Sequence, residues 1–287
     1  MTTTASTTTT ATRARLPDAT RIKSAHLRVQ SLERALGFYQ GILGFTVAEN
    51  GGKTAALTPA AGEAPILYLT EHPNAVRKPQ RSTGLYHVAI LMPDRPALGR
   101  VLRRLIERRV EIGASDHLVS EALYLSDPDG NGLEIYRDRP RTEWKMNGNK
   151  VAMASEPLDA EGILAAGGGG EGGMVAGTTI GHMHLHVSDL ARAEAFYSGL
   201  LGFDVMQRDY PGALFVSAGG YHHHLGLNIW AGKLPPPANA VGLEDWTIVI
   251  PGEDAWAQAV TRTGATIEGE NAIVRDPDSI MLVLAKG

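Results

Sequence analysis

The chain has 287 residues, of which 43% are hydrophobic and 20% charged, so it is long enough for two ordinary domains with substantial cores. Its formal net charge of −4, without a basic run interleaved with aromatic residues, argues against a general nucleic-acid-binding protein. Because the sequence contains no cysteine, disulfides, thiolate metal sites and cysteine nucleophiles are excluded.

The N-terminal segment, residues 1–20, is rich in threonine and alanine and lacks the apolar core of a secretory signal. We expect it to be a disordered tail. No apolar run in the chain approaches the roughly 18 residues of a membrane span. The expected protein is therefore soluble and cytoplasmic, with neither a membrane nor a nucleic acid as partner.

Residues 21–140 are predicted to form two β-α-β-β-β modules, recognised by the change from alternating to helical hydrophobic spacing. In the first module we expect a strand, a helix and three short strands, at Ile22–Val29, Leu32–Tyr39, Thr46–Glu49, Thr54–Leu57 and Ile66–Leu69. In the second we expect the same order at Leu85–Leu91, Arg95–Arg109, Ile112–Leu118, Ala122–Leu125 and Leu133–Tyr136. The run Asp127–Asn131 is predicted to be the turn between the last two strands.

Residues 141–177 include the glycine-rich stretch Gly167–Gly173. This composition predicts a flexible linker. A phosphate-binding loop is excluded, because its glycines would have to lie between a strand and a helix, often with a lysine.

The rest of the chain, residues 178–287, repeats the first half. Val29, Phe38-Tyr39 and Leu43-Gly44-Phe45 recur 158 residues later as Val187, Phe196-Tyr197 and Leu201-Gly202-Phe203. After a contraction, Asp127-Pro128-Asp129 recurs 149 residues later at Asp276. The sequence thus predicts an α+β fold of tandem βαβββ modules, four modules in two halves, forming curved, barrel-like mixed sheets.

Residue types that bind metals differ between equivalent positions of the repeat. The position seven residues before each helix start is occupied, in module order, by Ser24, His87, His182 and Asp245. On the last strand, Glu134 of the first half corresponds to Val283 of the second. Two histidines and one carboxylate form the facial set that holds non-haem Fe(II). We therefore expect one composite site of His87, His182 and Glu134 and a lost second one.

Simpler explanations exist for each residue taken alone. A strand histidine is more often a satisfied core or surface residue than a ligand, and Glu134 alone would pass for a solvated carboxylate. The composite site also requires modules two and three to pair. The sequence leaves open whether they pair within one chain or between subunits. We expect the protein to be a homo-oligomer.

The pattern resembles the vicinal oxygen chelate superfamily, which includes glyoxalases, bleomycin and fosfomycin resistance proteins and extradiol dioxygenases. It is more closely similar to two-domain bacterial catechol 2,3-dioxygenases of the CatE type. The matching stretches are Ser31–Arg34, Gly84–His87, Asp116–Tyr124, Asp127–Ile135, Gly181–Asp189 and Gly219–Asn228. The resemblance makes residues 21–140 and 178–287 two domains of this superfamily.

The resemblance also implies roles for single residues. It makes His87, His182 and Glu134 the metal ligands and Tyr124 a substrate-binding residue, and it places Asp116 or His117 near the substrate. The acid–base catalyst falls within His222-His223-His224. Aligning Gly226 favours His223 and aligning Asn228 favours His224, and these two would face opposite sides of a strand. Without the resemblance, Tyr124 would pass for a core aromatic residue, and the histidine run for adventitious surface metal binders.

The implied function is extradiol ring cleavage of a catechol by O2 at Fe(II), with Mn(II) the other ion that this ligand set accepts. Two alternatives on the same scaffold are a glyoxalase- or lyase-type enzyme that uses Ni or Zn, and a metal-free binding protein similar to bleomycin resistance proteins. Fold alone does not separate the three.

Overall fold

The computed structural model describes residues 14–147, 150–170 and 172–287. The first two modules consist of β1 (Arg21–Val29), α1 (Leu32–Tyr39), β2 (Thr46–Asn50), β3 (Thr54–Thr58), β4 (Leu67–Glu71), β5 (Gly84–Leu91), α2 (Arg95–Glu107), β6 (Gly113–Asp116), β7 (Ser120–Ser126) and β8 (Gly132–Asp138). Every element predicted in the first half is present, so the predicted α+β modules are confirmed.

The second half repeats this order with one irregular helix. Its elements are β11 (Thr179–His186), α4 (Leu190–Glu194) continuing into a π-helical turn (Ala195–Leu201), β12 (Asp204–Gln207), β13 (Ala213–Ser217), β14 (Leu225–Asn228), β15 (Gly242–Ile250), α5 (Glu253–Thr263), β16 (Thr266–Glu268), β17 (Asn271–Arg275) and β18 (Met281–Lys286). In three of the four modules, the helix begins with a side-chain N-cap. Ser31, Asp94 and Asp189 each accept a hydrogen bond from the backbone three residues later.

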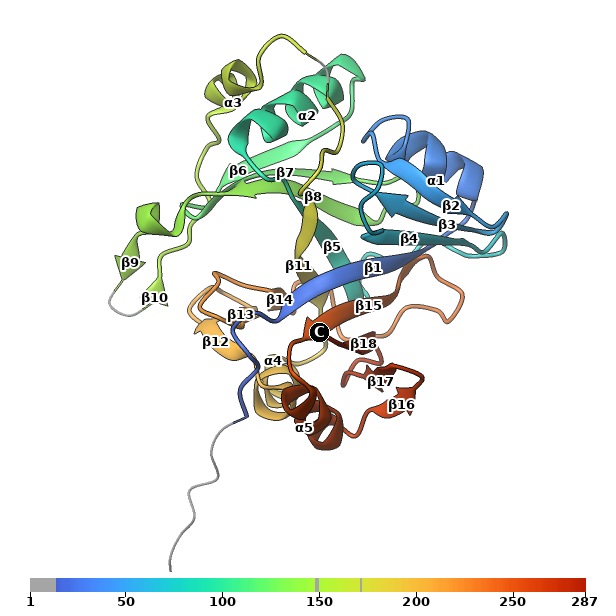
Figure 1. The fold of residues 1–287 in the computed structure, drawn as a ribbon, viewed down its shortest axis with the longest axis vertical. Helices are drawn as coiled ribbons and strands as arrows, with labels where there is room; N and C mark the ends of the chain where they lie inside the picture. The colour runs from blue at the N-terminus through green and yellow to red at the C-terminus, as the bar shows by residue number, and fades with distance from the viewer. Residues whose placement is uncertain (1–13, 148–149, 171) are drawn as a thin grey trace, which may run out of the picture.

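The modules pair across the two halves rather than within them. One eight-stranded sheet has the order β16-β17-β18-β15-β1-β4-β3-β2 and combines modules one and four. The other has the order β12-β13-β14-β11-β5-β8-β7-β6 and combines modules two and three. The central pairs β1–β15 and β5–β11 are antiparallel and lie near the middle of the molecule, with the helices at its two ends (Figure 1). Modules two and three therefore pair within one chain.

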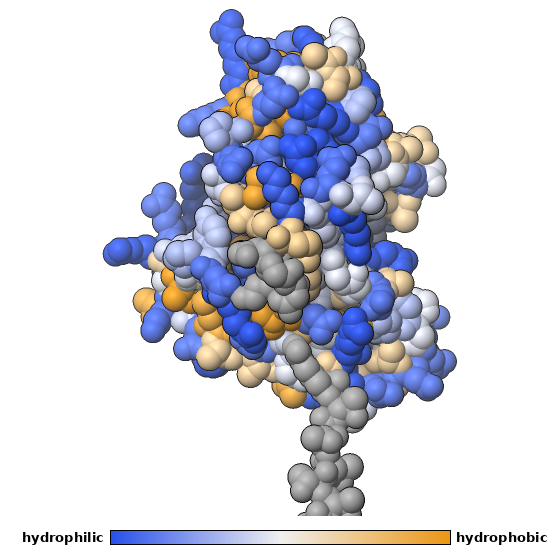
Figure 2. Space-filling view, turned by 90° about the vertical axis from the view of Figure 1, so that its left-hand side faces the viewer, coloured by the Kyte–Doolittle hydropathy of each residue, from blue (hydrophilic) through white to orange (hydrophobic). Residues whose placement is uncertain are grey.

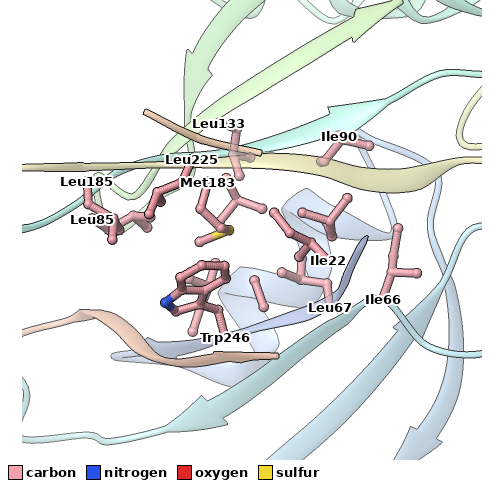
Figure 3. Packing of buried hydrophobic residues seen from close by; sticks show 14 of the residues in the cluster. Ile22, Ile66, Leu67, Leu85, Ile90, Leu133, Met183, Leu185, Leu225 and Trp246 are labelled. Atoms are coloured by element: carbon pink, nitrogen blue, oxygen red, sulfur yellow. The ribbon is translucent and has the colours of Figure 1, made fainter. Parts of the chain in front are cut away.

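The core lies between the two sheets. Trp246, Ile22 and Leu67 of one sheet extend toward Met183, Leu185 and Leu225 of the other (Figure 3). All six side chains are at most 4% exposed. On the face drawn in Figure 2, hydrophilic side chains predominate and hydrophobic ones occupy smaller areas. None of the described helices is long and apolar enough to cross a membrane.

The segment predicted to be a flexible linker contains structure of its own. Its elements are a 3-10 turn (Arg141–Glu143), the short paired strands β9 (Met146–Asn147) and β10 (Lys150–Val151), and the helix α3 (Ala160–Gly167), which packs on α2. A Cβ atom at Gly99 of α2 would lie 2.1 Å from the carbonyl oxygen of Ile163. Glycine at 99 and 167 is thus explained by the close approach of two helices, which composition alone does not distinguish from flexibility.

Part of the predicted N-terminal tail also packs against the protein. Leu16 is 3% exposed, and its backbone N–H donates to the carbonyl of Gly202 over 2.8 Å. Arg15 forms an ion pair with Asp204. Residues 1–13 of the predicted tail lie outside the described residues.

Each half contains a buried tyrosine–aspartate hydrogen bond that joins its two modules, and hence the two sheets. Tyr39 Oη donates to Asp127 Oδ2 over 3.0 Å, and the equivalent Tyr197 Oη donates to Asp276 Oδ2 over 2.9 Å. Burial raises the pKa of Asp276 from 3.8 to about 6, although hydrogen bonds from Tyr197 and from the Ile280 backbone act in the opposite direction. Folding therefore disfavours ionisation of Asp276 relative to the unfolded chain.

This shift predicts how Asp276 affects stability with pH. Because the folded-state pKa lies above the unfolded-state one, protonated Asp276 stabilises the folded protein relative to ionised Asp276. This stabilisation is fully present below about pH 4 and is lost as the pH rises to about 6. In Asp276→Asn, we expect the unfolding free energy relative to wild type to rise by up to about 3 kcal/mol between these pH values. Urea unfolding at several pH values measures the difference. A difference that is constant with pH would contradict the assignment.

Candidate metal centre and its pocket

Strand register brings the three candidate ligands together. In the sheet of modules two and three, Ala89 of β5 pairs with His182 of β11 on one side and with Glu134 of β8 on the other. His87 lies two residues before Ala89, so its side chain is on the same face of the sheet. Three residues distant in sequence thus meet above one alanine.

The ligand atoms converge closely. Glu134 Oε2 lies 3.0 Å from His87 Nε2 and 3.1 Å from His182 Nε2. The three ligand atoms all lie within 4.8 Å of one another, and the residues are 2–4% exposed. Within the described parts of the chain, no other three such side chains meet in this way.

The protonation states suit a metal. Burial alone would raise the pKa of Glu134, but His182 and His87 hold it well below its ordinary value. Burial lowers the pKa of His182. Ionised carboxylate and neutral imidazole are the forms that bind metals. In addition, Nδ1 of His182 is buried without a hydrogen-bond partner among the described residues, and Nε2 of His87 has none there apart from its contact with Glu134. The residues therefore fit a non-haem metal ion.

The other sheet has the same register but different chemistry. Thr247 of β15 pairs with Ser24 of β1 and Val283 of β18, the counterparts of His182 and Glu134. Asp245, the counterpart of His87, lies 3.0 Å from His26 Nδ1, whose Nε2 lies 2.7 Å from Thr70 Oγ1. Serine, aspartate and valine thus stand in this sheet at the positions that His182, His87 and Glu134 hold in the other.

A cavity of about 380 Å³ opens beside the three ligands. Its walls come from the strands β5, β6, β7, β8, β11 and β13, from the segments before β7, β13 and β14, and from the segments after β10 and β14. They are formed by Tyr86, His87, Ser115, His117, Val119, Ser120, Tyr124, Glu134, Met153, Ala154, Ser155, His182, His184, Tyr210, Phe215, His223 and Trp230. Of the further predicted site residues, His117, Tyr124 and His223 line this cavity and His224 does not.

The structure distinguishes the histidines of the run 222–224. The ring of His223 lines the cavity with its centroid 4.1 Å from that of His182, and burial holds its pKa well below the ordinary value. His224 points elsewhere, with Nδ1 2.8 Å from Ser217 Oγ. Of the two candidate acid–base residues, His223 therefore reaches the cavity, whereas His224 is turned toward Ser217.

Tyr124 and His117 are joined by a hydrogen bond. Nδ1 of His117 lies 2.7 Å from the carbonyl oxygen of Ala154, which can only accept, so this nitrogen carries the proton. Nε2 then accepts from Tyr124 Oη over 2.6 Å. Burial and the charge of Glu134 raise the pKa of Tyr124, which stays protonated. Asp116, the other residue predicted to lie near the substrate, forms an ion pair with Arg139 instead.

Several residues that line the cavity were not predicted from the sequence to be site residues. His184 accepts from Asn228 Nδ2 over 3.0 Å, and a Cβ at Gly226 would lie 2.9 Å from its ring. The alternation of His182, His184 and His186 along one strand was a signal for it. Tyr86, Tyr210, Phe215 and Trp230 show no such pattern. They come from separate strands and loops, so only the fold reveals that they gather.

Comparisons with known proteins agree with this architecture. The model of the family described as the glyoxalase/bleomycin resistance protein/dioxygenase superfamily matches residues 21–135 and 179–283. The chain is 52% identical over 273 residues to a catechol-2,3-dioxygenase from Bacillus subtilis (strain 168), with 91% of this chain and 95% of that protein covered.

Solved structures with low sequence identity share the fold. One is glyoxalase I from Zea mays, with a TM-score of 0.56, 17% identity and coverage of 93% of this chain and 92% of that one. Another is the cppA protein from Streptococcus pneumoniae TIGR4, with a TM-score of 0.58, 11% identity and coverage of 96% and 100%. At these identities the likeness concerns the fold alone.

The site geometry predicts which variants lose metal. His87→Ala removes one of three converging ligand atoms, so we expect metal bound after dialysis to fall below about a tenth of the wild-type amount. Asp245→Ala changes the equivalent position of the other sheet and should keep the wild-type amount. Elemental analysis of both purified variants measures this, with circular dichroism as the folding control. Equal metal loss in the two variants, or none in His87→Ala, would contradict the site.

Proposed function

Because the chain belongs to the glyoxalase/bleomycin resistance protein/dioxygenase superfamily, we propose that it cleaves a catechol ring beside the diol, using O2 at a metal held by His87, His182 and Glu134. It is a metal-dependent extradiol dioxygenase, similar over nearly its whole length to the catechol-2,3-dioxygenase from Bacillus subtilis. The observation that carries the assignment of the site is the convergence of two histidines and one carboxylate beside a cavity.

We propose Fe(II) as the resident ion, with Mn(II) as the alternative that this ligand set also accepts. When bound, the metal supplies a positive, redox-active centre whose open positions suit the vicinal oxygens of a catechol and O2. The three protein ligands occupy one face, which leaves the cavity side for the reactants. The cavity thereby brings both reactants together and limits the access of water.

The cavity residues supply the proton chemistry. His223 is neutral near physiological pH because burial lowers its pKa, so it can take a proton from a catechol hydroxyl and return it later. The Tyr124 hydroxyl donates a hydrogen bond to His117 Nε2, so its oxygen can accept a hydrogen bond from a substrate hydroxyl. These two residues orient the diol from different sides of the cavity.

The cavity walls favour an uncharged catechol. Among the described residues that line it there is no lysine or arginine, and the one carboxylate is Glu134. Five tyrosine, phenylalanine and tryptophan side chains line it instead: Tyr86, Tyr124, Tyr210, Phe215 and Trp230. A cavity of ~150 Å³ accommodates benzene, so the observed volume of about 380 Å³ leaves room for apolar ring substituents. A carboxylate there would lose water without gaining a partner.

Oxygen uptake tests the function. Protein reconstituted anaerobically with Fe(II) should consume one O2 per catechol and yield a ring-opened semialdehyde. The kcat/KM for 3,4-dihydroxybenzoate should be at least about tenfold lower than that for 4-methylcatechol, because the carboxylate is unpaired. Protein loaded with Ni(II) or Zn(II) serves as the control and should consume no O2. Isomerase or lyase activity of that control, or catechol binding without O2 uptake by the iron form, would overturn the assignment.

A further inference from the structure

A chain of hydrogen bonds leads from the cavity to a carboxylate that the proposed chemistry does not yet use. The rings of His223 and His222 meet through their Nδ1 atoms, which lie 2.7 Å apart. Nε2 of His222 lies 2.8 Å from Oδ1 of Asp138. His222 is 0% exposed, so its ring exchanges no hydrogen bonds with solvent. Asp138, His222 and His223 thus form a continuous relay that ends at the cavity wall.

The partners determine where the protons lie. A carboxylate accepts hydrogen bonds and does not donate them, so Nε2 of His222 carries a proton. In a neutral His222, Nδ1 is then the acceptor, and the proton between the two rings belongs to Nδ1 of His223. A neutral His223 therefore keeps Nε2 unprotonated. The ring to which that nitrogen belongs lines the cavity.

The carboxylate is itself held by Tyr221, whose hydroxyl is in turn bonded to the buried Tyr136. Tyr221 Oη donates to Asp138 Oδ2 over 2.8 Å, and Tyr136 Oη lies 2.8 Å from Tyr221 Oη. Because Tyr221 uses its proton on the carboxylate, Tyr136 donates to Tyr221. Glu134, Tyr136 and Asp138 alternate along β8 and so share one face of the sheet. One strand thus carries both the metal-binding carboxylate and the carboxylate of the relay.

We propose that Asp138 and His222 are positioning residues that set the tautomer of His223 and share the positive charge that it gains; this rests on the proposed function. When the catechol O–H bond breaks, a new N–H bond forms at Nε2 of His223. The Nδ1 proton of His223 can then pass to Nδ1 of His222, which places the charge beside Asp138. The reverse transfer returns the proton to the ring-opened product. No atom changes its oxidation state in this step.

Substitution of Asp138 tests whether it positions His223 or only stabilises the fold. In Asp138→Ala, we expect kcat with catechol to fall at least about tenfold, whereas metal content and the KM for catechol stay within about twofold. The Asp138 side chain is 23% exposed, so a small anion can enter the space that the substitution leaves. Added formate should restore much of the rate. Formamide, which has a similar shape and no charge, should not.

Two further variants serve as second test and matched control. His222→Asn breaks the relay at its centre and should lower kcat to a similar extent without rescue by formate. His224→Asn changes the next histidine, which bonds to Ser217 outside the cavity, and should keep kcat within about threefold of wild type. An Asp138→Ala variant with unchanged kcat, or one rescued equally by formate and formamide, would overturn the proposal.

A measurement without turnover distinguishes failure of the relay from failure of the proposed function. In nitrogen-15 spectra of the Zn(II)-loaded protein, His223 should be protonated at Nδ1 and unprotonated at Nε2. In Asp138→Ala this preference should be lost. If wild type consumes no O2 with any catechol, the proposed function fails, and these spectra still decide the relay. A proton on Nε2 of His223 in the wild-type protein would refute it.

Discussion

The antiparallel pairing of β5 with β11 is the constraint on which the site depends. It places His182 beside Ala89, and the parallel pairing of β5 with β8 places Glu134 on the other side of the same residue. A shift of one residue in either register would turn a ligand to the opposite face of the sheet. Neither half of the chain contains the complete set, so the core between the sheets and the two tyrosine–aspartate bonds also keep the ligands in register.

The duplication explains why the two sheets share one strand order while three candidate metal ligands converge in one of them. Thr247 pairs with equivalent strand positions to those that flank Ala89, but these positions are Ser24 and Val283 instead of His182 and Glu134. Asp245 is bonded to His26, within a sheet of the same strand order. The two sheets thus share backbone geometry and differ in side chains. The fold tolerates this because the ligand residues contribute to chemistry, whereas apolar residues such as Trp246 and Met183 hold the sheets together.

Much of this was predictable from the sequence because it is written in local patterns. The repeat, the alternation of strand residues and the unequal residues at equivalent positions identified the modules and the set His87, His182 and Glu134. The pairing of modules two and three within one chain was not predictable, because alternation shows which face of a strand is buried and not which strand lies next to it. The expected homo-oligomer and the division into two domains stay predictions.

Three features of the structure could not be predicted from sequence patterns. His223 and His224 precede β14, where strand alternation does not yet indicate which of them reaches the cavity. Composition predicted a flexible linker where α3 packs against Gly99 through Gly167, since close packing and flexibility both favour glycine. The relay of Asp138 and His222 joins segments more than eighty residues apart. No spacing in the sequence connects them.

The central claim is that the duplicated chain holds one composite metal site. Anaerobic calorimetric titration of the metal-free protein with Fe(II) measures the stoichiometry directly. The account predicts one tightly bound ion per chain, and none bound tightly in the sheet of Ser24, Asp245 and Val283. Two equivalent ions per chain, or one ion for every two chains, would contradict it.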